Sequence, residues 1–252
     1  MSEKISKKNL SHHLTQSLQT FANNIIVFLF MAIALGVLDT LVFHGALTLN
    51  GISPTDNILS LASSPANKNL LIKLGFSTIA LLMTSKAIVG PLISILVVVF
   101  SRSTLKGVAL DFGKALNFAI KRYSTVFMPY LLAWLSIQFG MIIIIPGIWF
   151  MRQYAFVDAV ATLEQEPHVL SRSKKLTASR KKSLFLLIIP YVLLGQVIQI
   201  ADFIYSNNFA LLAGINALYE AMLLVIMGTF YSLYHERVEL IAQRRAERKT
   251  QA

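Results

Sequence analysis

Hydrophobic residues gather along this chain in long runs that short polar or basic segments separate. A helix rises about 1.5 Å per residue, so a run of roughly 20 apolar residues can cross a hydrocarbon core about 30 Å thick. The pattern predicts an all-α, polytopic membrane protein with six transmembrane helices. We place these spans at residues 21–43, 70–100, 124–145, 148–163, 183–201 and 209–234.

The third and fourth predicted spans follow each other with only Pro146 and Gly147 between the two apolar runs. Proline lacks a backbone N–H and glycine tolerates positive φ, so this pair can reverse the chain between two membrane helices. We therefore predict one tight Pro-Gly hairpin between spans three and four. Gly90-Pro91 and Pro190 predict a bend in span two and an interruption in span five.

Two stretches beside the apolar runs have an amphipathic pattern. Residues 5–21 place apolar side chains near one helical face, and residues 101–122 repeat this pattern with basic residues on the other side. Such segments are typical of helices that lie on the inner leaflet. We therefore predict a single integral domain: an interfacial helix at residues 1–20, a six-span bundle at 21–234 and a charged cytoplasmic tail at 235–252.

Composition supports a membrane location, because 55% of the residues are hydrophobic and only 14% are charged, against about 25% charged in soluble domains. Residues 1–20, 101–122, 164–182 and 235–252 contain three, five, six and five of the 23 Lys and Arg residues. Basic residues concentrate on the cytoplasmic side of membrane proteins. We therefore expect both termini in the cytoplasm, loops 44–69 and 202–208 outside, and anionic lipid headgroups rather than nucleic acid as partners.

The segment from the hairpin to residue 182 has a specific pattern: an aliphatic run into Pro-Gly, a span, an acidic turn and a Ser-Arg-Ser-x-x-Leu-Thr helix. Its positions are Pro146, Gly147, Glu164, Ser171, Arg172, Ser173, Leu176 and Thr177. This pattern, with FYSLYHERVEL at residues 230–240, resembles YciC-like bacterial inner-membrane proteins and the related membrane domain of some glycerophosphodiester phosphodiesterases. The resemblance implies a six-helix domain in the bacterial cytoplasmic membrane. It does not imply phosphodiesterase activity, which belongs to a separate catalytic module.

No motif for catalysis or nucleotide binding is present in the sequence: there is no P-loop, G-x-G-x-x-G, H-E-x-x-H or G-x-S-x-G. The chain has no cysteine, which excludes disulfides, thiolate metal sites and a cysteine nucleophile. The adjacent residues His12 and His13 diverge by about 100° on a helix and do not share a face. We therefore predict no enzymatic activity, no cofactor and no metal.

Polar residues inside the predicted spans are the candidates for function, because an ionisable group in hydrocarbon is costly and is usually paired or functional. Lys86 and Glu220 lie midway along spans two and six, so we predict that they contact each other or share one polar pocket. Arg152 is placed near the outer interface, where Asp202 could meet it. The full set of candidates is Lys86, Arg152, Asp158, Asp202, Asn216 and Glu220.

These charges leave two interpretations open: buried pairs that fix helix packing, or a polar cavity for a lipid headgroup, a proton or a small solute. We prefer a non-enzymatic, multi-pass inner-membrane protein that acts in envelope or lipid homeostasis or as a membrane partner of other proteins. The alternative is a small transporter or channel that uses Lys86, Asp158 and Glu220. A membrane enzyme acting on lipid would need a clustered acid/base or metal site, which the sequence does not reveal.

Overall fold

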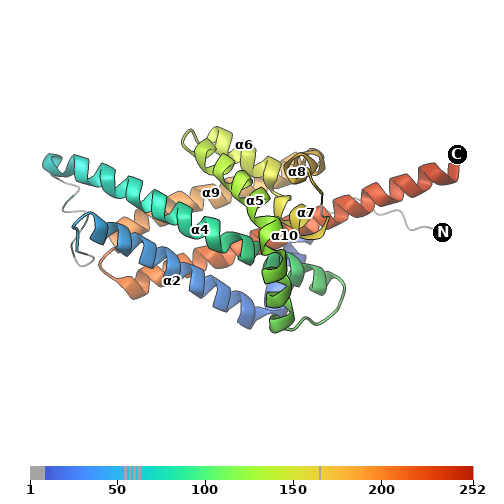
Figure 1. Cartoon of the computed structure of the whole chain (residues 1–252), viewed down its shortest axis with the longest axis horizontal. Helices are drawn as coiled ribbons and strands as arrows, with labels where there is room; N and C mark the ends of the chain where they lie inside the picture. The colour runs from blue at the N-terminus through green and yellow to red at the C-terminus, as the bar shows by residue number, and fades with distance from the viewer. Residues whose placement is uncertain are drawn as a thin grey trace. The chain divides into compact units, whose positions relative to one another are not determined.

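The computed structural model describes residues 9–53, 56, 58, 61, 64–164 and 166–251, and these residues form helices with no strand among them. The predicted all-α fold is confirmed (Figure 1). The elements are α1 Leu10–Asn23, α2 Ile25–Leu49, the 3-10 helix η1 Pro65–Asn67, α4 Lys68–Leu105, α5 Phe112–Met141, α6 Ile145–Tyr154, α7 Val157–Leu163, α8 Val169–Thr177, α9 Lys181–Ile204 and α10 Phe209–Gln251.

Four helices in the described part of the chain are long and apolar enough to cross a membrane. They are α2, α4, the Lys181–Asp202 part of α9 and the Phe209–Arg248 part of α10. The predicted third and fourth spans do not appear among them. The second half of α5 contains Pro129, Tyr130 and Gln138, which lower its mean hydropathy. The predicted fourth span is divided between α6, with 10 residues, and α7, with seven.

The chain divides into two compact units. Unit 1 comprises Met1–Ile25, Pro91–Ile189 and Val225–Ala252, and unit 2 comprises Ile26–Gly90 and Pro190–Leu224. Two of the boundaries fall at Pro91 and Pro190, the positions where the sequence predicts a bend and an interruption. A proline inside a helix removes one backbone hydrogen bond, although α4 and α9 are each assigned as one helix through it.

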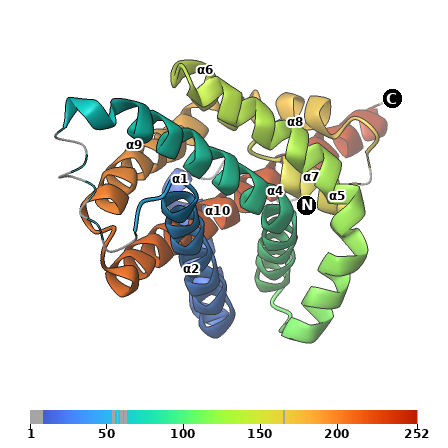
Figure 2. The same ribbon diagram turned by 60° about the vertical axis from the view of Figure 1, so that its left-hand side comes forward.

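Unit 2 has its own hydrophobic core, in which residues of α2, α4 and α10 pack together. Phe43, Leu47, Leu74 and Leu212 are all at most 3% exposed. The ribbons of α2 and α10 cross in Figure 2. Their backbones approach closely at Gly36, where an added Cβ would lie 2.3 Å from the amide nitrogen of Ala217. Small residues permit this close approach of two helices.

In unit 1, α1 buries a polar face. Its buried residues are His13, Ser17 and Thr20, whereas Leu18 is 51% exposed. The Ser17 hydroxyl donates to the carbonyl of Val225, 2.5 Å away. The sequence correctly indicates an amphipathic helix, but it does not show which face is buried. The polar face can be buried because α10 supplies hydrogen-bond partners for it, and the pattern of residues in α1 does not reveal these partners.

The turn between α5 and α6 differs from the prediction. The chain reverses through Ile142, Ile143 and Ile144, and Ile144 has φ of 60°. Pro146 instead occupies the first turn of α6, where its fixed φ suits a helix start. Gly147 is helical and packs closely against α5, because a Cβ at Gly140 would lie 2.7 Å from the Gly147 nitrogen.

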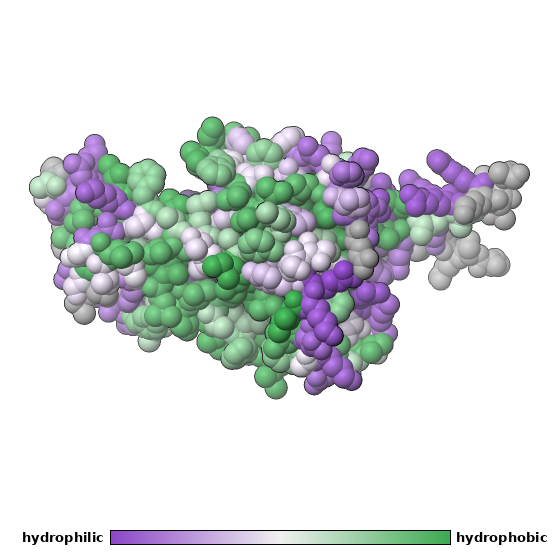
Figure 3. Space-filling model, viewed as in Figure 1, coloured by the Kyte–Doolittle hydropathy of each residue, from purple (hydrophilic) through white to green (hydrophobic). Residues whose placement is uncertain are grey.

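Large apolar side chains cover much of the surface of α2 and α4. Ile26 is 81% exposed, Phe30 65% and Phe76 72%. Figure 3 shows hydrophobic side chains gathered over these two helices. An apolar surface of this extent marks contact with a membrane or with another protein.

Candidate functional site

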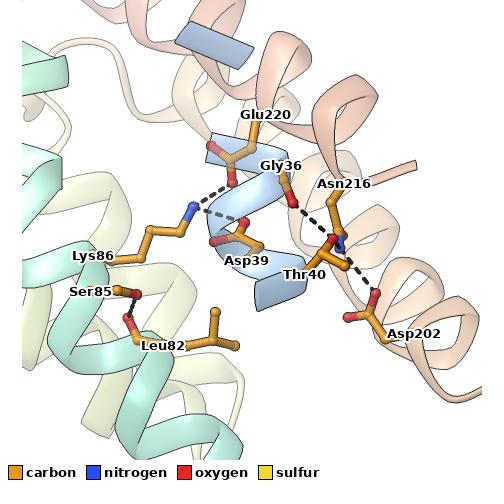
Figure 4. A network of polar contacts seen from close by, with 9 residues as sticks. All are labelled: Gly36, Asp39, Thr40, Leu82, Ser85, Lys86, Asp202, Asn216 and Glu220. Atoms are coloured by element: carbon orange, nitrogen blue, oxygen red, sulfur yellow. Dashed lines mark hydrogen bonds and ion pairs between the residues drawn. The ribbon is translucent and has the colours of Figure 1, made fainter. Parts of the chain in front are cut away.

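Three charged side chains from three helices of unit 2 meet in one cluster. Lys86 of α4 places its Nζ 2.9 Å from Asp39 Oδ2 of α2 and 2.7 Å from Glu220 Oε1 of α10 (Figure 4). The predicted contact between Lys86 and Glu220 is therefore confirmed. We call Asp39, Lys86 and Glu220 the charge cluster.

Asp39 is a member that the sequence analysis missed. It lies in the first predicted span, within the apolar stretch GVLDTLVF. The rule that selected Lys86 and Glu220, an ionisable group inside an apolar run, also applies to Asp39. Asp39 and Glu220 contact the same lysine because of how three helices pack together. The spacing of residues along the chain does not show this packing.

The charge cluster is largely removed from solvent, and its formal charges do not balance. The side chain of Glu220 is 3% exposed, that of Asp39 13% and that of Lys86 21%. Asp39 Oδ1 and Glu220 Oε2 are buried and have no hydrogen-bond partner among the described residues. Two ionised carboxylates and one ammonium carry a net charge of −1, which a bound proton or cation would neutralise.

A second group of polar side chains in unit 2 begins one helical turn away from Glu220. Asn216 Nδ2 donates to Thr40 Oγ1 and to Asp202 Oδ1, both at 3.3 Å. The Thr40 hydroxyl donates in turn to the carbonyl of Gly36 at 2.9 Å. Figure 4 shows this polar chain beside the charge cluster. Two of the predicted candidates, Asn216 and Asp202, are therefore in direct contact.

The other two candidates, Arg152 and Asp158, lie in unit 1. The guanidinium carbon of Arg152 lies 5.8 Å from the ring centre of Trp149 and 5.4 Å from that of Phe185. The proposed pairing of Arg152 with Asp202 stays a prediction, because these residues belong to different units. Asp158 lines a cavity of about 10 Å³ in unit 1 together with Ser94.

The acidic turn and the basic helix of the sequence signature form an ion pair. Arg172 Nε lies 2.7 Å from Glu164 Oε2, and this hydrogen bond raises the pKa of Arg172. The hydroxyl of Tyr234 donates to Glu164 Oε1 at 2.8 Å. The two segments that carry the family resemblance, around residues 164–177 and 230–240, therefore meet in the structure.

Three of the four remaining signature positions have structural roles in α8. The hydroxyls of Ser173 and Thr177 both donate to the backbone carbonyl of Gln153, at 2.9 and 3.4 Å. Leu176 is 1% exposed, whereas Ser171 is exposed. These contacts fasten α8 to the end of α6.

A buried network in unit 1 joins α1 to α10. His13 Nδ1 lies 2.8 Å from Ser232 Oγ, and His13 Nε2 lies 3.0 Å from Glu236 Oε2. Ser232 donates to Gln16 Oε1 at 2.5 Å, and Arg180 forms an ion pair with Glu236. Burial lowers the pKa of His13 and outweighs the opposite effect of Glu236. No sequence motif points to this network, because its members are up to 223 positions apart.

In the described ranges no three His, Cys, Asp or Glu side chains are grouped so that they could hold a metal ion. The charge cluster, in which ionisable side chains from three helices meet at hydrogen-bond distance, is the strongest candidate for a functional site. Comparison with family models, with curated proteins and with solved structures finds no match for this chain. The resemblance to YciC-like proteins stays a prediction.

Proposed function

We propose that this chain is a non-enzymatic, multi-pass protein of the bacterial cytoplasmic membrane, and that the charge cluster holds α2, α4 and α10 together. The observation that carries the proposal is the direct pairing of Lys86 with carboxylates from two other helices. A central lysine costs about 2.5 to 3.5 kcal/mol on membrane-insertion scales. Pairing at hydrogen-bond distance offsets this cost and favours one packing of the three helices.

The distribution of charge and apolar surface supports the membrane location. Unit 2 contains three of the 23 Lys and Arg residues, namely Lys68, Lys73 and Lys86, so the other 20 belong to unit 1. Both predicted external loops lie in unit 2. We infer from this asymmetry that the four basic segments face the cytoplasm, and that the protein acts in envelope or lipid homeostasis or as a membrane partner of other proteins.

A mutant cycle tests the structural role of the cluster. Lys86→Met leaves buried carboxylates without their cation, which typically costs about 3 to 5 kcal/mol. We expect the double variant with Lys86→Met and Glu220→Gln to recover part of this lost stability. The melting temperature in detergent is the measurement. Lys73→Met is the matched control, because Lys73 lies on the same helix and is exposed. Additive losses for Lys86 and Glu220 would reject coupling between them.

The surplus carboxylate favours a second candidate, a small proton-coupled transporter. Asp39 and Glu220 share one lysine, and the polar chain of Thr40, Asn216 and Asp202 lies beside them. Proton movement into liposomes under an imposed membrane potential, read with an internal pH dye, tests this function. If the protein is such a transporter, protons should enter the liposomes, and Asp39→Asn should abolish this proton movement while the protein stays folded. Equal signals from protein-containing and empty liposomes would reject it.

A further inference from the structure

We infer that α5 and α6 form a re-entrant hairpin, which enters the bilayer from the cytoplasmic side, places its turn among the acyl chains and returns without reaching the outer surface. The inference rests on the proposed membrane location, with the basic segments in the cytoplasm. All the residues concerned belong to unit 1. The protein then has four spans and one hairpin in place of six spans.

The position of Trp149 sets the depth of the hairpin. Trp149 lies on α6, four residues after the helix begins at Ile145, a rise of about 6 Å. Its ring centre is 5.9 Å from the Nζ of Lys174. Lys174 is exposed and belongs to α8, in the basic segment 164–182. Trp149 therefore lies beside the basic segment, and the tip of the hairpin is only about 6 Å farther along α6. At that distance the tip cannot reach the far side of a hydrocarbon core about 30 Å thick.

Arg152 gives a second, independent marker of depth. Its guanidinium lies 5.4 Å from the ring of Phe185, which is three residues after the basic pair Lys181 and Lys182. Phe185 is therefore near the cytoplasmic end of α9. Arg152 is about 10 Å along α6 from Ile145, so both markers place α6 close to the cytoplasmic surface.

The turn itself has the chemistry of a surface that contacts lipid. Ile142 is 78% exposed, Ile143 70% and Ile145 77%. Four consecutive isoleucines, residues 142–145, thus form an apolar patch that the described protein leaves uncovered. Because the basic surface on either side of the hairpin already lies at the headgroups, the acyl chains of the same leaflet are the occupant that fits this patch.

The backbone of the turn suits a location without water. The amide of Ile143 donates to the carbonyl of Gly140 at 3.2 Å, and that of Ile144 donates to Met141 at 3.0 Å. Ile145 donates to Ile143 at 2.6 Å, and Pro146 has no N–H to satisfy. Unsatisfied backbone groups are costly in hydrocarbon, so these bonds allow the turn to lie within it.

Neither helix of the returning arm is long enough to cross the membrane by itself. α6 and α7 have 10 and seven residues, or about 15 and 10 Å. Five of the seven residues of α7 are buried within the protein. A re-entrant hairpin leaves residues 101–122 and 164–182 on the same side of the membrane, and so would two additional spans. Both topologies therefore agree with the distribution of basic residues.

The absence of cysteine from the chain permits a direct test with single-cysteine variants of this chain. We would compare Ile143→Cys with Asn207→Cys, in the predicted external turn, and Lys106→Cys, in the predicted cytoplasmic loop. A membrane-impermeant maleimide is applied to intact spheroplasts and to inverted vesicles. A bimane label at residue 143 is then quenched with lipids that carry bromine on their acyl chains.

We expect Asn207→Cys to react from outside, Lys106→Cys from inside, and Ile143→Cys from neither side, with strong quenching of the bimane by brominated lipid. Reaction of Ile143→Cys from outside at the rate of Asn207→Cys would overturn the inference in favour of a spanning hairpin. Reaction from inside without quenching would overturn it too, because the turn would lie in water. Failure of Asn207→Cys to react from outside would instead contradict the proposed membrane topology. An unchanged melting temperature shows that each variant is folded.

Discussion

His13 Nδ1 and Ser232 Oγ lie 2.8 Å apart, although 219 positions separate them in the sequence. The contact joins α1 to α10 within unit 1. Both residues are at most 4% exposed. The titratable groups that act on His13 are Glu236 of α10, Arg180 before α9, and His12 on its own helix. The protonation state of this buried imidazole therefore affects how firmly α1 is attached.

We expect unit 1 to lose stability in acid because of His13. Burial holds the pKa of His13 below its ordinary value of 6.5, so the unfolded chain binds this proton more tightly than the folded protein does. The contribution of neutral His13 is therefore complete above about pH 6.5 and falls as the pH decreases below that value. Melting temperatures in detergent at pH 8 and pH 5.5 measure the loss.

Replacement of the histidine separates this effect from general acid sensitivity. His13→Gln should lower the melting temperature at pH 8 and reduce its further decrease at pH 5.5. His12→Gln is the matched control, because His12 is the exposed neighbour on the same helix. If both variants show the wild-type pH dependence, His13 is not the responsible group.

The close contact of α2 with α10 predicts a large difference between two glycines of α2. Gly36→Ala places a Cβ 2.3 Å from the Ala217 nitrogen, and overpacking of this kind costs about 1 to 3 kcal/mol. Gly45→Ala meets no atom within 4 Å and should gain up to about 1 kcal/mol from helix propensity. Thermal unfolding of both variants provides the measurement, and equal melting temperatures would contradict the packing.

The hydrogen bond from Tyr234 to Glu164 predicts a specific cost for removing one hydroxyl. Tyr234→Phe should destabilise the protein by about 1.5 to 3 kcal/mol, the usual value of a hydrogen bond to a charged group. Tyr205→Phe should change little, because Tyr205 is 41% exposed. Urea unfolding followed by circular dichroism gives both values. A neutral Tyr234→Phe would show that α10 is fastened to the signature segment by other contacts.

Reporter fusions test the predicted orientation. A fusion at Asn207 should behave as external, and fusions at Lys106, Lys175 and Arg245 as cytoplasmic, because the last three lie in the basic segments. Alkaline phosphatase activity and fluorescent-protein signal give opposite readouts on the two sides. A cytoplasmic Asn207 would contradict the predicted external position of the loop at residues 202–208.

Sequence reasoning located the charge cluster only in part. Lys86 and Glu220 stand out because each interrupts a long apolar run, and the cost of an unpaired charge in hydrocarbon predicts that they meet. Asp39 obeys the same rule, and the prediction missed it. What the sequence cannot show is that a single lysine contacts both carboxylates, since this depends on close packing at Gly36 and Ala217.

The hairpin shows a different limit. Pro146 and Gly147 correctly indicate a break in the apolar run, but proline and glycine have several uses, and here they start α6 and pack it against α5. The reversal uses Ile144 at positive φ, a conformation that costs free energy for a β-branched residue and that no pattern predicts. Local propensity thus marks the boundary, while tertiary packing selects which residues make the turn.

Unit 1 also imposes an order on biosynthesis. Its third stretch begins at Val225, and α1 needs Ser232 and Glu236 from that stretch. Ribosomes add about 5 to 20 residues per second, so roughly 10 to 45 s separate the synthesis of His13 from that of its partners. During this interval the polar face of α1 has neither Ser232 nor Glu236 to bind. A ribosome that stalls before residue 225 therefore leaves the nascent chain with α1 undocked and its polar face without these two partners.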